Sequence, residues 1–243
     1  MIEFENTAII ISARMAGGPL PGRPMVDVNG KPLIVRAWQS AIASNIGHVL
    51  VASGDNNIAE AVRAVGGEAL VAPGHLKAET DQVADVLALR DPAQKFKFVM
   101  SLPCHLAAID PLSLRRCLAG LMNKDVDIAT LAFATMALRP GATRLYVPLE
   151  GEREVAYVRS ITRAGESQVA ASAFEHISVY AYRRAALETF AKLPVGADEQ
   201  AGGPEMQRAL ENGLKLAAVK VDTAPLSVDT PAELEALRRL LKA

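Results

Sequence analysis

The amino-acid sequence predicts an α/β fold built on a doubly wound, mostly parallel sheet, and two observations carry this prediction. The first is an apolar run of strand type, residues 8–13, which ends abruptly in a loop rich in glycine and proline. A buried parallel strand presents its carboxyl end to a ligand crevice in this way. The second is that strand-like and helix-like segments alternate up to residue 102, a spacing typical of βαβ units.

The individual elements follow in order after the first loop. Pro32 is well placed to open a helix through residues 33–42, whose apolar positions lie three and four residues apart. A second helix is capped by Asn56 and Asn57 and stopped by glycines, and a third is capped by Thr80. Further strands are predicted at residues 48–52, 68–71 and 96–102.

From about residue 126 the pattern changes, because strand-like segments are now joined by turns without intervening helices. These segments are residues 128–133, 144–147, 155–158 and 176–182. The α/β pattern then returns with a helix at 204–213, a strand at 215–221 and a helix at 232–241. We therefore predict a single domain, residues 1–243, with a β-rich insertion at about residues 126–195.

Composition excludes several classes of protein. The 26 basic and 27 acidic residues nearly balance, which argues against a nucleic-acid partner bound by bulk electrostatics. No apolar run approaches the roughly 18 residues that span a bilayer, and the N-terminus lacks the basic start of a secretory signal. Cys104 and Cys117 have no metal-ligand spacing and are expected to be free thiols. A soluble cytoplasmic protein without a membrane partner is the prediction.

The loop after the first strand carries the first functional signal. It places Arg14 and Arg23 among glycines, which let a backbone approach a ligand closely. A guanidinium group suits phosphate because its planar fork binds two oxygens at once. The alternative is a surface loop with two solvated arginines, and this stretch alone does not decide between them.

Five stretches match one known family in the family's own order. They are Ala-Arg with Leu-Pro-Gly-Arg-Pro in residues 13–24, Asn-Gly-Lys-Pro at 29–32, the Thr-Asp helix start at 80–86, Glu-His-Ile-Ser-Val-Tyr-Ala-Tyr-Arg at 175–183, and Val-Asp-Thr-Pro-Ala-Glu-Leu at 228–234. Together they resemble the motifs of the CMP-Kdo synthetases. These cytidylyltransferases activate the eight-carbon sugar acid Kdo for lipopolysaccharide assembly.

The resemblance implies a nucleotidyltransferase-type domain that transfers CMP from CTP to Kdo or a related acid sugar and releases pyrophosphate. Positioning and charge neutralisation would carry the rate of such a transfer. The implied catalytic residues are Arg14, Arg23 and Asp229. The implied nucleotide contacts are Ser12, Ala13, Arg14, Arg23, Ser53, Thr80 and Asp81. The implied sugar contacts are His176, Tyr180 and Glu205. The resemblance also implies a homodimer formed through the β-rich part.

The family's metal motif is altered in this chain. In relatives, two aspartates hold Mg²⁺, so the resemblance implies this cofactor. Matching residues 109–111 to the family places His105 where one of these aspartates belongs, whereas Asp229 is kept. Asp229 and His105 are therefore the candidate metal ligands. An imidazole suits zinc and other transition metals better than magnesium, so either the metal use has changed or the site has decayed.

Other departures reduce the positive charge expected around a triphosphate. Pro19 and Gln82 stand where the family has arginines, and Ala78-Glu79 replaces a Ser-Gly pair. These losses would weaken CTP binding unless Arg23, Lys77 or Arg159 compensates. They support an alternative function, a catalytically degenerate nucleotide- or sugar-binding relative, either a pseudoenzyme or a partner subunit. A dinucleotide-dependent oxidoreductase is not favoured, because no Gly-x-Gly-x-x-Gly turn follows the first strand.

Three candidate residues also have simpler interpretations. Asp229 precedes Thr-Pro and is a good helix N-cap as well as a candidate metal ligand. His176 is either a sugar contact or a hydrogen-bonded histidine at the start of a strand. Cys104 beside His105 suggests a thiol nucleophile or a soft metal site, but two adjacent loop residues usually form neither.

Overall fold

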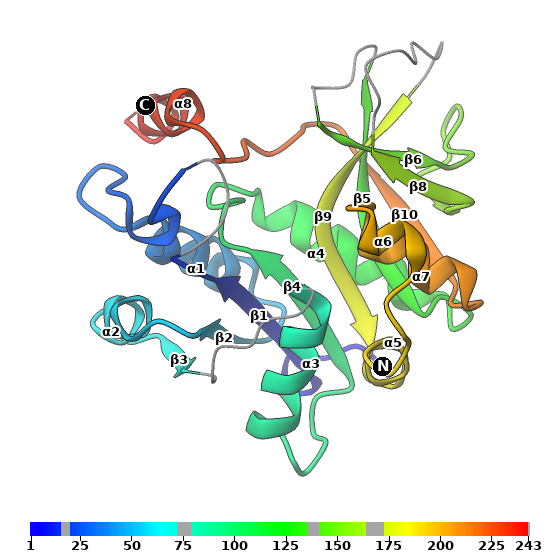
Figure 1. Ribbon diagram of the computed structural model, residues 1–243, viewed down its shortest axis with the longest axis horizontal. Helices are drawn as coiled ribbons and strands as arrows, with labels where there is room; N and C mark the ends of the chain where they lie inside the picture. Colours follow the sequence, from blue (N-terminus) through cyan, green and yellow to red (C-terminus); the bar gives the residue numbers. More distant parts are fainter. Residues whose placement is uncertain (16–19, 72–78, 136–140, 164–172, 243) are drawn as a thin grey trace. The chain divides into compact units, whose positions relative to one another are not determined.

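The computed structural model describes residues 1–15, 20–71, 79–135, 141–163 and 173–242. It divides into two compact units, residues 1–115 with 225–243 and residues 116–224. Figure 1 shows both, coloured along the sequence. The insertion predicted at about residues 126–195 lies inside the second unit. The grouping of the whole chain into one domain stays a prediction.

The first unit contains a four-stranded parallel sheet. Its strands are β1 (Thr7–Ala13), β2 (His48–Ser53), β3 (Glu68–Val71) and β4 (Phe98–Pro103). They lie in the order β3-β2-β1-β4, and every neighbouring pair is parallel. β1 is central and almost wholly apolar, with Ile9 against Val49 on one side and Met100 on the other. The predicted parallel sheet is confirmed in this unit.

The path of the chain through this sheet reverses at β1. It runs outward from β1 to β2 and β3 through α1 (Leu33–Ser44) and α2 (Asn56–Arg63), and then returns through α3 (Glu79–Arg90) to β4. Because parallel crossovers are right-handed, a reversed connection places its helix on the opposite face. Figure 1 shows α3 in front of the strands and α1 behind them. The carboxyl ends of β1 and β4 therefore form a topological switch point, where open α/β sheets bind ligands.

Some predicted boundaries are wrong by a residue. α3 begins at Glu79, so Thr80 lies inside the first helical turn and does not cap it. Asp55, not Asn56, occupies the N-cap position of α2. One helix, α4 (Pro111–Ala119), was not predicted. The unit ends with α8 (Pro231–Leu240), and short 3-10 helices occur at η1 (Phe4–Asn6) and η2 (Arg23–Met25).

The second unit is rich in antiparallel pairs. Its strands are β5 (Ile128–Thr135), β6 (Thr143–Tyr146), β7 (Val155–Tyr157), β8 (Ser160–Arg163), β9 (Ala173–Arg183) and β10 (Leu216–Val221). They form the order β9-β5-β10-β7, and β6 pairs with both β8 and β9. β10 and β5 are parallel, and the remaining pairs are antiparallel. β8 was not predicted, whereas the other strands were.

Helices and a buried ion pair complete the second unit. The helices are η3 (Gly120–Met122), α5 (Arg184–Phe190), α6 (Ala197–Gln200) and α7 (Glu205–Glu211). Arg208 of α7 is buried, pairs with Glu199 at 3.0 Å and lies over the ring of Phe190. Neither described cysteine forms a disulfide, and burial raises the pKa of Cys117. No helix in the described ranges is long and apolar enough to cross a membrane.

Candidate active site

The loop after β1 is closed by a left-handed glycine. Gly22 has a φ of 64° and its amide donates to the carbonyl of Met15. A side chain at such a φ is strained, which explains the use of glycine there. The chain then enters η2 with Arg23 as its first residue. Arg14 and Arg23 thus follow the carboxyl end of the central strand. Pro19 lies outside the described residues.

This loop is held by groups at the end of β2. Asp55 Oδ2 accepts from the amide of Met15 at 3.1 Å, and Ser53 Oγ accepts from the amide of Asp55 at 3.0 Å. Ser53 is fully buried, so the observed role of its hydroxyl is to hold Asp55. Ala13 is also buried. The nucleotide contacts predicted for Ser53 and Ala13 stay predictions.

Arg23 and Asp229 form an ion pair across 206 residues of sequence. Arg23 Nη1 donates to Asp229 Oδ1, and Ser227 Oγ donates to the other carboxylate oxygen. The cap of α8 is Thr230, whose Oγ1 accepts from the amide of Glu233. The alternative interpretation of Asp229 as the N-cap is therefore wrong. Asp229 does not cap the helix; its carboxylate pairs with the Arg23 guanidinium and orients it.

One atom of Arg23 lacks a partner in the described part of the chain. Its Nε–H group is buried and donates a hydrogen bond to no described residue. A buried donor without an acceptor costs free energy, so such groups in native proteins are usually satisfied by another group, a water or a ligand. A phosphate oxygen is a suitable acceptor for a guanidinium Nε–H.

Glu79 also lies in this site, although no motif in the sequence predicts a function for it. Its Oε1 accepts from Ser12 Oγ at 2.7 Å and from Ser101 Oγ at 3.1 Å. Desolvation raises the pKa of its carboxyl above 4.5, although both hydroxyls and the charges of Arg14 and Arg23 act in the opposite direction. The signal available in the sequence was that an acid stands at a position where the family has a small residue.

Cys104 and His105 follow β4 directly. Cys104 is buried, and desolvation raises the pKa of its thiol to about 11, even with Arg23 nearby. The sulfur is therefore protonated at neutral pH, whereas an activated nucleophile needs a lowered pKa. The carbonyl of His105 accepts from the amide of Val228 at 3.0 Å. The His105 segment thus lies against the segment that carries Asp229.

The first turn of α3 contains the other predicted nucleotide contacts. Thr80 and Asp81 are both buried there. Gln82, which stands where the family has arginine, is also buried, and its Nε2 donates to the carbonyl of Ala52 at the end of β2. This position therefore contributes packing and a neutral hydrogen bond in place of a positive charge. Lys77, the other candidate cation, lies outside the described residues.

The side chains around Asp229 do not fit a Mg²⁺ ion held by the protein. Within the described ranges, no three His, Cys, Asp or Glu side chains gather as a metal site. Both oxygens of Asp229 are engaged, one by Arg23 and the other by Ser227. The second candidate ligand, His105, offers nitrogen, whereas Mg²⁺ prefers oxygen ligands in near-octahedral geometry. The Arg23 guanidinium is thus paired with the Asp229 carboxylate, which a bound metal ion would need as a ligand.

In the second unit, β9 brings His176 and Tyr180 together, with ring centroids 5.2 Å apart. His176 Nε2 lies 2.9 Å from Thr130 Oγ1, and burial lowers the pKa of His176 to about 3. The imidazole is therefore neutral at physiological pH. The register between β5 and β9 shifts next to Thr130, and irregularities of this kind re-aim side chains near binding sites. Glu205 is the first residue of α7 and is partly exposed.

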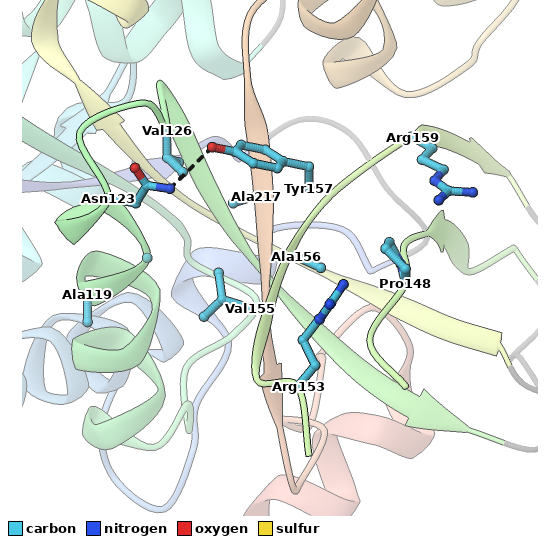
Figure 2. A pocket seen from close by; sticks show the side chains of 11 residues that line it. Ala119, Asn123, Val126, Pro148, Arg153, Val155, Ala156, Tyr157, Arg159 and Ala217 are labelled. Carbon is cyan, nitrogen blue, oxygen red and sulfur yellow. Dashed lines mark hydrogen bonds between the residues drawn. The ribbon is translucent and has the colours of Figure 1, made fainter. Parts of the chain in front are cut away.

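The second unit also contains a cavity of about 530 Å³ beside β7 (Figure 2). Tyr157 accepts a hydrogen bond from Asn123 Nδ2 at 3.3 Å in its wall. Arg153 and Arg159 also line the cavity. Arg159, one of the cations considered as a replacement for the missing arginines, therefore lies at this cavity. None of the predicted sugar contacts is among the residues that line it.

A parallel sheet with a glycine-containing loop and two arginines at its switch point defines a nucleotide-binding α/β protein. The family can be stated more closely, because the model of the cytidylyltransferase family matches residues 8–216. The chain belongs to this family.

Relatives match over nearly the whole chain. A 3-deoxy-manno-octulosonate cytidylyltransferase from a Bradyrhizobium species is 40% identical over 238 residues, 96% of each chain. The enzyme of that name from Paramagnetospirillum magneticum is 36% identical over 239 residues, 97% of each. A solved CMP:2-keto-3-deoxy-manno-octonic acid synthetase complexed with CTP has a TM-score of 0.84 at 27% identity, covering 97% of this chain and 98% of that one. The mixed α/β fold predicted from the sequence is confirmed.

Proposed function

We propose that this protein transfers CMP from CTP to Kdo or a closely related acid sugar and releases pyrophosphate. The observation that carries the proposal is that Arg14 directly follows the central strand and Arg23 begins the 3-10 helix at the end of the same loop, at the switch point of the sheet. Relatives named for this reaction are 36% and 40% identical over nearly full length, which supports the same substrates here.

The described residues supply charge and position for this transfer. A hydroxyl oxygen of the sugar bonds to the α-phosphorus of CTP, and the bond from that phosphorus to the bridging oxygen breaks. The hydroxyl proton passes to water, and pyrophosphate leaves. Arg14 and Arg23 neutralise phosphate charge, and Asp229 fixes the Arg23 fork so that little reorganisation is needed. His176, Tyr180 and Glu205 are the proposed sugar contacts.

Mg²⁺ is expected to have a smaller role here than an ion held by two protein carboxylates. Because Asp229 is paired with Arg23, any Mg²⁺ in the reaction is expected to come with the phosphates of CTP and not to be held by the protein alone.

We also propose a cytoplasmic location, because both cysteines are free thiols, as in reducing compartments.

The first experiment measures pyrophosphate release from CTP and Kdo, in Mg²⁺ and again in Mn²⁺. We expect turnover of about 1 s⁻¹ or faster, within the usual range for enzymes. Reactions without Kdo, and reactions with UTP in place of CTP, are the controls. Absence of release in both metals, with CTP still bound, would favour the degenerate relative considered above over the enzyme.

We propose that the protein forms a homodimer through the second unit. β7 pairs with β10 on one side and with no second strand in the described ranges. Its Val155 and Tyr157 are each 44% exposed. An edge strand with exposed apolar side chains is a template for pairing with another chain.

Light scattering tests this interface. We expect a particle of twice the 25.8 kDa chain mass for the wild type. Tyr157→Glu is expected to shift the equilibrium toward the monomer by at least tenfold, because it places a charge on the edge strand. Val195→Glu is the matched control, since Val195 is equally exposed but lies outside every strand. A monomeric wild type at micromolar concentration would contradict the dimer.

A further inference from the structure

Glu79 occupies the switch point of the parallel sheet. Ser101 of β4 pairs with Ile10 of β1, and Ser12 lies two residues further along β1. Side chains two residues apart share a face of a strand, so both serine hydroxyls lie on the same face of the sheet. Glu79, the first residue of α3, receives a hydrogen bond from each of them. Its carboxyl group is therefore fixed between the ends of the two strands that flank the ligand crevice.

The two hydrogen bonds decide where a proton would sit on this carboxyl. Ser12 and Ser101 both donate to Oε1, and no described residue forms a hydrogen bond with Oε2. A protonated Glu79 therefore carries its hydrogen on Oε2, the oxygen that accepts from neither serine. Glu79 as a whole is partly exposed.

The charged groups around Glu79 are the same ones that would bind phosphate. Arg14 and Arg23 act on it from the loop after β1, and the thiol of Cys104 lies nearby after β4. On α3 itself, Asp81 is the other acid of the first turn. Desolvation raises the pKa of Glu79 and outweighs the two serine hydroxyls and the arginines, which favour the ionised carboxylate.

A bound triphosphate changes this balance in one direction. Phosphate oxygens would pair with Arg14 and Arg23, and the two arginines would then stabilise the negative charge of the Glu79 carboxylate less. They would also bring like charge close to Glu79, and both effects favour the neutral acid. We propose that Glu79 is a binding residue of the nucleotide site that meets the triphosphate as a neutral carboxylic acid, so that nucleotide binding takes up one proton. The inference rests on the proposed use of CTP.

The proposed step is the transfer of one proton. One proton passes from solvent to Glu79 Oε2 for each nucleotide bound, and no bond of the nucleotide changes. The Oε2–H group then donates to an acceptor atom on the ligand, where a carboxylate would repel it. Uptake of a proton means that affinity falls as pH rises: above the pKa of Glu79 in the free protein, the apparent Kd increases by up to about tenfold per pH unit.

Calorimetry of CTP binding in buffers with different ionisation enthalpies measures this proton directly. The titrations run from pH 6.0 to 8.5 with the wild type, Glu79→Gln and Glu60→Gln. Glu60 is an exposed acid of α2 and serves as the matched control. We expect up to one proton taken up per CTP by the wild type and by Glu60→Gln. The Glu79→Gln variant should take up about one proton fewer and should bind CTP at least tenfold more tightly than the wild type at the highest pH.

Calorimetry of cytidine binding to the wild type is a second test, and it needs no variant. It has the same base and sugar but no phosphate, so its binding to the wild type should take up no proton. Equal uptake with cytidine and CTP, or undiminished uptake in a folded Glu79→Gln protein, would overturn the inference. CTP binding without proton uptake would also overturn it while leaving the proposed function intact. Failure of CTP to bind at all would overturn both.

Discussion

Arg23→Ala is expected to lower kcat/KM for CTP by about 100- to 1000-fold, the usual cost of removing one preorganised charged or polar group from a transition state. The structure gives two reasons. The substitution removes a guanidinium whose buried Nε has no partner in the described residues and is free for a phosphate oxygen. It also leaves the Asp229 carboxylate without its counter-charge, next to an incoming polyanion. Steady-state kinetics with CTP as the varied substrate measure the loss.

Two further variants separate charge from geometry. Arg23→Lys keeps the positive charge but loses the planar fork. We expect it to recover at least tenfold of the activity lost in Arg23→Ala. Arg239→Ala removes an exposed arginine of α8 and should leave kcat/KM unchanged. A loss smaller than tenfold in Arg23→Ala would contradict the role given to Arg23.

His105→Asp is expected to create a divalent-cation site where the present side chains do not fit one. The carbonyl of His105 accepts from the amide of Val228, so residue 105 and Asp229 lie on adjoining segments. A second carboxylate there supplies the oxygen ligands that Mg²⁺ and Mn²⁺ prefer, and a cation bound between the two carboxylates competes with Arg23 for Asp229. We expect the affinity for Mn²⁺, measured by electron paramagnetic resonance without nucleotide, to rise at least tenfold over the wild type.

His105→Asn is the matched control, because it has the size of aspartate without the charge. It should bind Mn²⁺ no better than the wild type. If the wild type already binds Mn²⁺ as tightly as His105→Asp, then Arg23 does not exclude a cation from Asp229. The assignment of Arg23 as the resident cation of that carboxylate would then be wrong.

Much of the fold was predictable because its signals are local. β1 to β4 are short apolar runs bounded by glycine, proline and polar turns, and the helices between them carry apolar residues three and four apart. β8 escaped prediction because only Ile161 of its four residues is buried, which leaves little apolar alternation to detect. Its pairing with β6 depends on contacts across the sheet, not on its own composition.

The candidate site divides in the same way. Arg14, Arg23 and Asp229 could be proposed as site residues because motifs of fixed spacing contain them. Glu79 could not, because its partners Ser12 and Ser101 lie 67 and 22 residues away and are brought to it only by the crossover of α3.

By itself, the sequence determined the class of fold, and it predicted a phosphate-binding loop after the first strand and an altered metal motif, because the signals for each lie in neighbouring residues. Only the tertiary structure decided that Asp229 pairs with Arg23 and leaves the helix cap to Thr230. It alone also placed a desolvated carboxyl at the switch point of the sheet. Charge pairing and desolvation depend on distances between groups that are far apart in the chain, and those distances exist only once the chain has folded.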